Sequence, residues 1–302
     1  MQPPTERKNV LRMFPGPAEP VPLQGLYLRE PLRPAARARG AKPFVYTNFI
    51  ASLDGRISLH DPKTAKRAVP RAIANARDWR LFQELAACAD SLVMSARYVR
   101  DLPRGVTATS FPVSVKPEHG DLHEWRLAQG LTQQPAIVIV SASLVLPSLV
   151  PLVESGRAVY VATGDAADPR RVARIESDGV RVLRVGAGAR AEGGRLVAAL
   201  AQERHRAIAM LGGGELLHAL IVDDVLDRLY LTLACRMLGG LPFDTLLTGP
   251  VLEPAARFRL AALHYDEGEA GAFEAADASG SDVEQLFAVL DRARAADATP
   301  EP

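Results

Sequence analysis

Strand-like and helix-like segments alternate along most of this chain, and that alternation restricts its fold more than any other feature. Apolar runs typical of buried strands are separated by segments with helical spacing, such as residues 70–89 and 168–179. The strand-like runs cover residues 43–51, 90–96, 136–142, 157–163, 180–186 and 207–211. A parallel sheet produces this rhythm, because a helix must carry the chain back to the start of the next strand. We therefore predict an α/β fold with a mainly parallel sheet and helices on both faces.

The two ends of the chain differ in composition from this central part. Residues 1–42 are rich in Pro and Arg, so we predict a mostly irregular N-terminal arm in which residues 25–32, GLYLREPL, could pack. Residues 268–302 read as an acidic, Ala-rich tail with a possible end helix. The helix is suggested by the shared face of Val283, Leu286, Phe287 and Leu290. Residues 43–267 would then form the folded domain.

Charge and cysteine content narrow the class of protein. Lys and Arg number 36 against 35 Asp and Glu, which argues against a dedicated nucleic-acid binder. The two cysteines, Cys88 and Cys235, cannot build a disulfide framework and suit a reducing compartment. The most apolar stretch, residues 136–153, is interrupted by Pro147 and Pro151. We therefore expect a cytoplasmic protein that binds neither nucleic acid nor membrane.

The sharpest local signal is MLGGGELLHAL, residues 210–220. A short apolar strand ends at Gly212, Gly213 and Gly214, and a helix follows directly. Glycine lets a ligand approach the backbone closely, and the free N–H groups of a helix start favour an anion such as phosphate. A tight strand-to-helix turn without a ligand would use the same residues. The segment matches neither a P-loop nor GxGxxG.

A second signal is YTNFIASLDGRISL, residues 46–59. Asn48, Ser52, Asp54 and Arg56 interrupt an otherwise apolar strand at even spacings. Even spacing directs side chains to one side of a strand, which is either solvent or a cleft. The pattern suits the recognition of a hydroxyl-rich or amide-bearing ligand. It also suits an Asp-Gly turn at a solvated edge, and local sequence does not separate the two.

Other polar groups are weaker candidates. His119 and His123 are four residues apart, but they lie in residues 103–135, which we expect to form a long loop containing Pro and Gly. We therefore predict no metal site. No Ser-His-Asp or Cys-His arrangement can be assigned either.

Taken together, three motifs resemble a known family. They are TNFIASLDGRIS, ADSLVMSARYV and LGGGELLHALIVDDVLDRLYLTLACRMLGG. In order and spacing, residues 43–266 resemble the reductase domain of the bacterial bifunctional riboflavin-biosynthesis deaminase/reductase, of the dihydrofolate-reductase-like superfamily. The resemblance implies a dihydrofolate-reductase-like central sheet, mainly parallel but mixed. It also implies a homodimer and a small-molecule substrate. The implied reaction is the NADPH-dependent reduction of 5-amino-6-(5-phosphoribosylamino)uracil, in which a ribosyl group becomes ribityl.

The same resemblance assigns roles to residues. The substrate side comprises Asn48, Ser52, Asp54 and Arg56, with Asp54 as the candidate catalytic carboxylate, although we assign it to binding before proton transfer. The glycine turn that holds cofactor phosphate comprises Gly212, Gly213, Gly214, Glu215 and Leu216. The central motif brings Ser95, Ala96 and Tyr98 to the cofactor. The strand ends at Ser141 and Thr163 are expected near the 2′-phosphate that distinguishes NADPH from NADH.

Several positions depart from the family pattern, among them Ser95, Tyr98, Leu211 and Ala86. Ser95 stands where a Gly is frequent, Tyr98 where a Thr is, Leu211 where an acidic residue is, and Ala86 where an Arg is. These changes lie at or near the expected site. They leave two alternatives open, a related NADPH reductase of another pterin-like or ribosylated substrate, and a nucleotide-binding homologue without catalysis.

Overall fold

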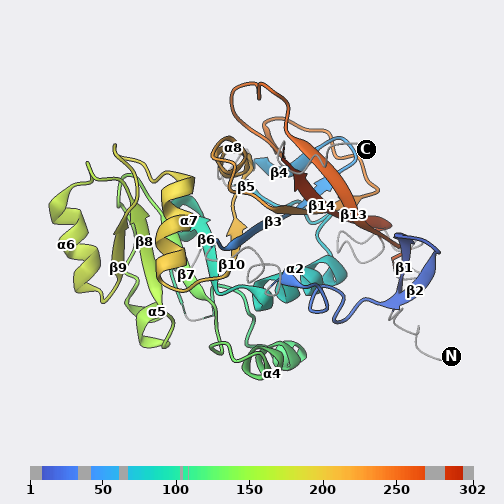
Figure 1. Cartoon of the computed structure of the whole chain (residues 1–302), viewed down its shortest axis with the longest axis horizontal. Coiled ribbons are helices and arrows are strands. Elements are labelled where there is room, and N and C mark those ends of the chain that lie inside the picture. Colours follow the sequence, from blue (N-terminus) through green and yellow to red (C-terminus); the bar gives the residue numbers. More distant parts are fainter. Residues whose placement is uncertain are drawn as a thin grey trace, which may run out of the picture.

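A large mixed sheet forms the centre of the molecule (Figure 1). The structure is a computed structural model, and it describes residues 9–32, 42–60, 67–102, 105–107, 109–268 and 283–294. The sheet has 11 strands in the order β2-β1-β13-β14-β11-β3-β10-β6-β7-β8-β9. From β11 to β9 neighbouring strands run parallel, whereas the other end is antiparallel. The predicted fold class, a mainly parallel mixed sheet with helices, is confirmed.

The parallel strands coincide with the apolar runs of the sequence. They are β3 (Phe44–Ser52), β6 (Ser91–Ser95), β7 (Ala136–Val140), β8 (Val159–Thr163), β9 (Arg181–Arg184), β10 (Ala207–Leu211) and β11 (Arg228–Ala234). In the central strands the side chains are buried on both faces, as consecutive Ile137, Val138 and Ile139 show. Burial on both faces is the reason that these strands read as continuous apolar runs.

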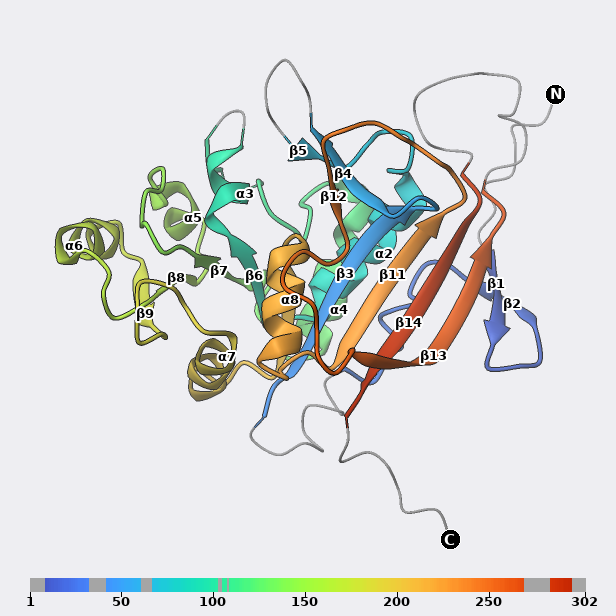
Figure 2. The ribbon, with the colours of Figure 1, turned by 90° about the horizontal axis from the view of Figure 1, so that it is seen from above.

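Helices cover the two faces of the sheet and enclose separate cores (Figures 1 and 2). One face carries α2 (Ala76–Cys88), α4 (Gly120–Ala128), α5 (Val150–Glu154) and α6 (Pro169–Ser177). The other carries α7 (Gly193–Gln202) and α8 (Gly214–Val222). The short α3 (Ala96–Arg100) follows β6 directly. None of the helices in the part of the chain described here has both the length and the apolar character needed to cross a membrane.

The predicted end helix is wrong, because residues Gln285–Ala293 form strand β14. It pairs with β11 on one side and with β13 (Arg257–Asp266) on the other. Gln285, Phe287 and Val289 are buried in alternation, which is the strand period. Apolar residues on both faces of the strand also satisfied a helical spacing, so periodicity alone did not separate the two.

The N-terminal arm is not an irregular appendage in the part described. β1 (Asn9–Phe14) and β2 (Glu19–Pro22) extend the sheet beyond β13. Residues 25–32 pack as predicted, as turns that bury Tyr27 and Leu32. The buried carboxylate of Glu84 on α2 accepts the backbone N–H groups of Gly25 and Tyr27 and fastens this segment to the core.

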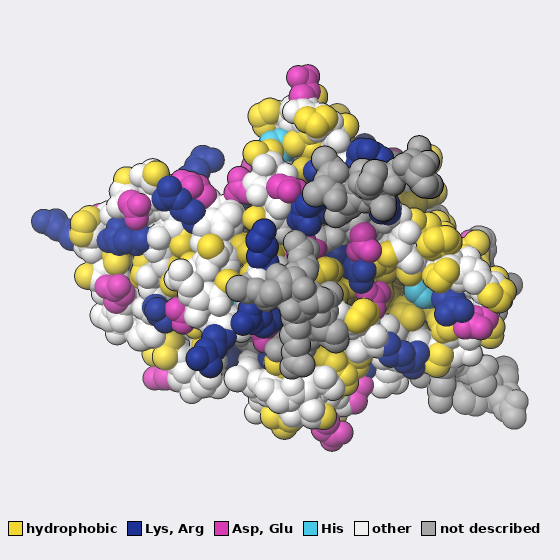
Figure 3. All heavy atoms as spheres, in the orientation of Figure 1, with side chains coloured by type: hydrophobic (Ala, Val, Ile, Leu, Met, Phe, Trp, Pro, Cys, Tyr) yellow, Lys and Arg dark blue, Asp and Glu magenta, His cyan; other side chains and the backbone are white. Residues whose placement is uncertain are grey.

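Two further features were missed in the sequence. The expected loop at residues 103–135 contains α4, preceded by a 3₁₀ turn, Pro117–His119. The turn after β3 leads into a small separate sheet of three strands. In order across the sheet, they are β12 (Phe243–Thr245), β4 (Arg56–His60) and β5 (Arg67–Ala68). On the side of the molecule seen in Figure 3, basic and acidic side chains are interspersed, consistent with the near-zero net charge.

Candidate functional site

A cavity of about 900 Å³ opens where several strands end beside the start of α2. Its walls come from the carboxyl ends of β6 and β10, the middle of β3, the first turns of α2, and the small sheet. Ligands of open α/β sheets bind beyond the carboxyl ends of the parallel strands. The cavity is therefore the candidate site.

Five of the residues predicted from sequence lie on the wall of this cavity. They are Asn48, Ser95, Tyr98, Gly212 and Gly213. They come from three neighbouring strands and α3, so the fold brings the opening, central and glycine motifs to one place. The three motifs therefore share one cavity in the fold.

The three glycines serve different purposes. A Cβ on Gly212 would meet Leu216 at 2.5 Å, and one on Gly214 would meet the backbone of Thr245 and Thr248 at 2.7 and 2.8 Å. Packing within the chain therefore explains why both positions are glycine. A Cβ on Gly213 would meet nothing within 4 Å, and Gly213 is the N-cap of α8. Of the three, Gly213 alone presents open backbone at a helix start, as a phosphate site requires.

Tyr98, the largest departure from the family pattern, does not close the cavity. Its ring packs on Phe111 with centroids 5.8 Å apart, and the side chain remains about half exposed on the cavity wall. Arg97 lines the same wall and brings a positive charge to it.

The other cofactor candidates lie away from the cavity wall. Ser141 follows β7 and accepts the backbone N–H of Leu144, and Thr163 ends β8 with its hydroxyl buried. Strand β7 pairs with β6 and β8 pairs with β7, all parallel, so both residues belong to the edge of the sheet that also carries Ser95. Ala96 is buried at the start of α3, Glu215 is exposed, and Leu216 packs on Gly212.

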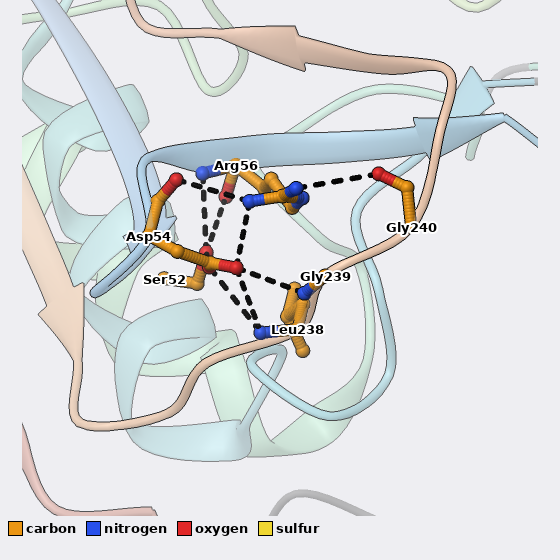
Figure 4. A network of polar contacts seen from close by, with 6 residues as sticks. All are labelled: Ser52, Asp54, Arg56, Leu238, Gly239 and Gly240. Carbon is orange, nitrogen blue, oxygen red and sulfur yellow. Dashed lines mark hydrogen bonds and ion pairs between the residues drawn. The ribbon is translucent and has the colours of Figure 1, made fainter.

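Ser52, Asp54 and Arg56 form a network at the turn from β3 to β4 (Figure 4). None of the three lines the cavity. The Asp54 carboxylate accepts hydrogen bonds from the Ser52 hydroxyl at 2.5 Å and from the backbone N–H of Gly239 at 2.8 Å. It also forms an ion pair with Arg56 at 2.6 Å. The expectation that all four polar residues of this motif line a cleft therefore holds for Asn48 and not for the other three.

This network gives Asp54 a low proton affinity. The hydrogen bonds from Ser52 and from the Gly239 backbone hold the pKa of the Asp54 carboxyl at about 2. A carboxyl group with that pKa carries no proton to donate at neutral pH. Its geometry ties the turn after β3 to residues 238–240, which lead to the small sheet.

The cavity contains a carboxylate that sequence reasoning missed. Asp78 lies in the first turn of α2 and lines the cavity beside Asn75, Trp79 and Phe82. Burial raises the pKa of Asp78 to about 6. A hydrogen bond from the Thr232 hydroxyl acts in the opposite direction, but its effect on this pKa is smaller. In the sequence, Trp79 and Phe82 fall within the helical spacing of residues 70–89, which gives no sign that they line a cavity. Trp79 is in fact half exposed. The signal available in the sequence was an acid beside two aromatic residues at the start of a helix, a combination that suits a ligand site.

A buried network fixes the beginning of α2 at the cavity. The Asn75 side chain caps the helix by accepting the N–H groups of Arg77 and Asp78. Gln285 on β14 donates to Asn75 at 3.1 Å and to Asp266 at 2.9 Å. The carboxylate of Asp266 in turn forms an ion pair with the guanidinium of Arg77 at 2.7 Å. The antiparallel end of the sheet thereby positions one wall of the site.

The two histidines considered as metal ligands are engaged elsewhere. The ring nitrogens of His123 face the carbonyl oxygens of Gln133 and Ser114 at 3.3 and 3.0 Å. His119 is buried before α4. Within the described residues, no group of three or more His, Cys, Asp or Glu side chains is placed to hold a metal ion.

Comparison with known proteins gives a family and a curated relative. Residues 43–266 match the RibD C-terminal domain family. A 2,5-diamino-6-ribosylamino-4(3H)-pyrimidinone 5′-phosphate reductase of Archaeoglobus fulgidus is 25% identical over 209 residues, which cover 69% of this chain and 87% of that protein.

Solved structures share the fold. A pyrimidine reductase-like protein of Corynebacterium diphtheriae superposes with a TM-score of 0.62 at 18% identity, covering 90% of this chain and 98% of that one. The riboflavin biosynthesis reductase Rib7 of Saccharomyces cerevisiae gives 0.56 at 14% identity, with coverages of 89% and 99%. RibD of Acinetobacter baumannii gives 0.55 at 16% identity, covering 84% of this chain and 59% of that one.

Proposed function

The chain belongs to the RibD C-terminal domain family, and from this we propose that it is an NADPH-dependent reductase of a ribosylaminopyrimidine phosphate. The observation that carries the proposal is the single cavity shared by the glycine turn, the end of β6 and the start of α2. One side offers open backbone for a phosphate and the other offers a carboxylate beside aromatic rings. An oxidoreductase that holds a dinucleotide and a heterocycle side by side needs both.

The residues on the cofactor side fit a dinucleotide phosphate. Gly213 leaves space for close approach, and the backbone N–H groups at the start of α8 favour negative charge. Arg97 adds a positive charge on the same wall. The aligned ends of β6, β7 and β8 extend this side toward Ser141 and Thr163, where we place the adenosine end and its 2′-phosphate.

The chemistry requires positioning more than acid–base catalysis. When bound, the cofactor supplies a hydride to the sugar carbon that bears the amine. The protein must hold the ribosyl group against the cofactor and exclude water from the cavity. Trp79, Phe82 and Tyr98 provide the apolar walls. Because Tyr98 leaves the cavity open, we favour an active reductase over a nucleotide-binding homologue without catalysis.

We also propose that the protein is a homodimer, as the resemblance implies. The long strand β11, apolar on one side, pairs with β3 and β14 inside the sheet and is therefore not free to pair with a second copy. A different surface now supports association. Leu11 and Met13 of β1 and Leu260 of β13 are 37, 47 and 40% exposed at the antiparallel end of the sheet. In Figure 2 the near side of β13 and β14 carries no helix. A cytoplasmic location remains a prediction.

The decisive experiment joins cofactor binding to turnover. Purified protein is titrated with NADPH and with NADH, and the loss of NADPH absorbance is then followed after ribosylaminopyrimidine phosphate is added. We expect tighter binding of NADPH than of NADH, and oxidation that depends on the substrate. Equal affinity for the two cofactors would reject the 2′-phosphate assignment. Binding of NADPH without any turnover would favour the homologue that lacks catalysis.

A further inference from the structure

The turn from β3 to β4 is bonded to a segment that lies far along the chain (Figure 4). The Asp54 carboxylate accepts the backbone N–H groups of Leu238 at 3.2 Å and Gly239 at 2.8 Å. Arg56 donates to the carbonyl oxygen of Gly240 at 3.3 Å and forms its ion pair with Asp54 at 2.6 Å. The turn therefore holds residues 238–240 in one fixed place.

The held segment leads into β12, which forms part of the cavity wall. The guanidinium carbon of Arg56 lies 4.2 Å from the centre of the Phe243 ring, at the first residue of β12. The next residue, Asp244, accepts the Ser58 hydroxyl at 2.5 Å and pairs with Arg67 at 2.8 Å. Ser58, Arg67 and Asp244 all line the cavity. The network at the β3–β4 turn thus determines where this wall stands.

The other end of β12 reaches the glycine turn. Thr245, the last residue of β12, lies opposite Arg56 in the small sheet. A Cβ on Gly214 would meet the Thr245 carbonyl oxygen at 2.7 Å and the Thr248 backbone nitrogen at 2.8 Å, so the start of α8 packs tightly on this segment. Gly213, with its open backbone, directly precedes Gly214. The segment therefore connects the wall of the small sheet to the turn that we assign to the cofactor phosphate.

We propose that Asp54 is a positioning residue that sets both sides of the cavity through one segment, residues 238–245. The inference rests on the proposed function for the identity of the two ligands. It gives the Asp54 carboxylate a role that requires no contact with either of them. Because the small sheet and the glycine turn share this segment, a shift of residues 238–240 would displace both. Loss of the carboxylate should therefore weaken the binding of NADPH and of the pyrimidine together.

Two other roles for Asp54 lead to different outcomes. A catalytic carboxylate acts only in the transition state, so its loss lowers kcat and kcat/KM equally and leaves ligand affinity unchanged. A carboxylate that only shapes a turn can be replaced by asparagine, which serves turns equally well. A positioning residue acts on the contacts of the bound ligands. Its loss raises KM and the dissociation constant of the cofactor, while kcat at saturation changes little.

The first test is Asp54→Asn, which keeps the size of the side chain and removes its charge. The amide has one oxygen where the carboxylate has two, and its NH₂ group cannot accept the remaining N–H. We expect the dissociation constant of NADPH and the KM of the ribosylaminopyrimidine phosphate each to rise roughly threefold to tenfold, with kcat changed less than about twofold. As a control, Glu203→Gln removes a carboxylate that pairs with Arg181 at 2.6 Å on the edge strand β9, and it should change none of these values.

Arg56→Met supplies a second test of the same segment. Methionine keeps an apolar stem beside Phe243 but loses the ion pair with Asp54 and the hydrogen bond to Gly240. If both residues act through residues 238–240, their effects on NADPH affinity should not add. The double variant should then bind NADPH about as weakly as the weaker single variant. Fully additive losses would contradict a shared route.

Hydrogen exchange separates the inference from the proposed function, because it requires no turnover. Asp54→Asn should speed exchange across residues 238–245 and at the start of α8, and leave β3 and β10 unchanged. This result in a protein that turns over no ribosyl substrate would sustain the positioning role and refute the proposed function. Unchanged exchange and NADPH affinity in Asp54→Asn, or a kcat that falls about a hundredfold at constant KM, would overturn the role of Asp54.

Discussion

At the scale of single residues, Gly213 and Gly214 offer a matched pair. Gly213 has an extended backbone, with φ −84° and ψ −172°, and open space where a Cβ would stand. Gly213→Ala should therefore fold normally, yet NADPH affinity should fall roughly tenfold, because the methyl group occupies the path of the phosphate. Gly214→Ala should instead lower the melting temperature, since its Cβ collides with Thr245 and Thr248. Titration and thermal melts of both variants check this, and an unchanged NADPH affinity in Gly213→Ala would remove the turn from the cofactor site.

The burial of Asp78 has a consequence for stability. Its pKa is about 6 in the folded protein against 3.8 as the unperturbed value. Between these values the folded state holds a proton that the unfolded state has lost, so the carboxyl favours folding at low pH and opposes it as pH rises toward 6. Asp78→Asn should therefore be more stable than wild type at pH 7, by roughly 1–3 kcal/mol, with the gap closing near pH 4. Chemical denaturation at several pH values measures it, and a destabilised variant at pH 7 would contradict the raised pKa.

At the scale of elements, the start of α2 depends on β14. Gln285 joins Asn75, the cap of α2, to Asp266 on β13. Gln285→Leu would remove one hydrogen-bond partner from each of these buried groups, at a cost of roughly 1–3 kcal/mol. Because α2 carries Asp78 and Trp79, the KM for the pyrimidine should rise more than the affinity for NADPH falls. The exposed neighbour Glu284→Gln serves as the control, with an expected change within about 0.5 kcal/mol.

At the scale of the whole molecule, the open question is the partner of the antiparallel end of the sheet. A stable dimer generally buries about 1,600 Å² in total, and apolar side chains at its centre carry most of the energy. We expect wild type to be a dimer by light scattering at micromolar concentration, and Met13→Glu with Leu260→Glu to be monomeric. Leu127→Glu changes an exposed leucine on α4 and should remain dimeric. A wild-type monomer would exclude the dimer, and a dimeric double variant would place the interface elsewhere.

The sequence by itself determined those parts of the protein whose signal is local. The parallel strands, α2 and the junction from β10 to α8 all appeared as predicted, because the residues of one element share a period and a glycine cluster marks a turn. Joint motifs in a fixed order also sufficed for the family. For the candidate site, local pattern and the family resemblance together named Asn48, Ser95, Tyr98, Gly212 and Gly213, and the fold places these five on one cavity, while their roles stay predictions.

Only the tertiary structure decided the rest, because in those places the partner lies far along the chain. Residues 285–293 satisfied a helical spacing, and it was pairing with β11 and β13 that made them a strand. From its sequence, Asp54 was expected to line a cleft. In the fold its carboxylate instead accepts the backbone N–H groups of Leu238 and Gly239, which lie far along the chain. Asp78 was not singled out in the sequence, because its burial depends on what the fold places around it, including Thr232 in β11 and the wall of the cavity. The environment of a charge is set by what the fold places around it, and no local pattern encodes that.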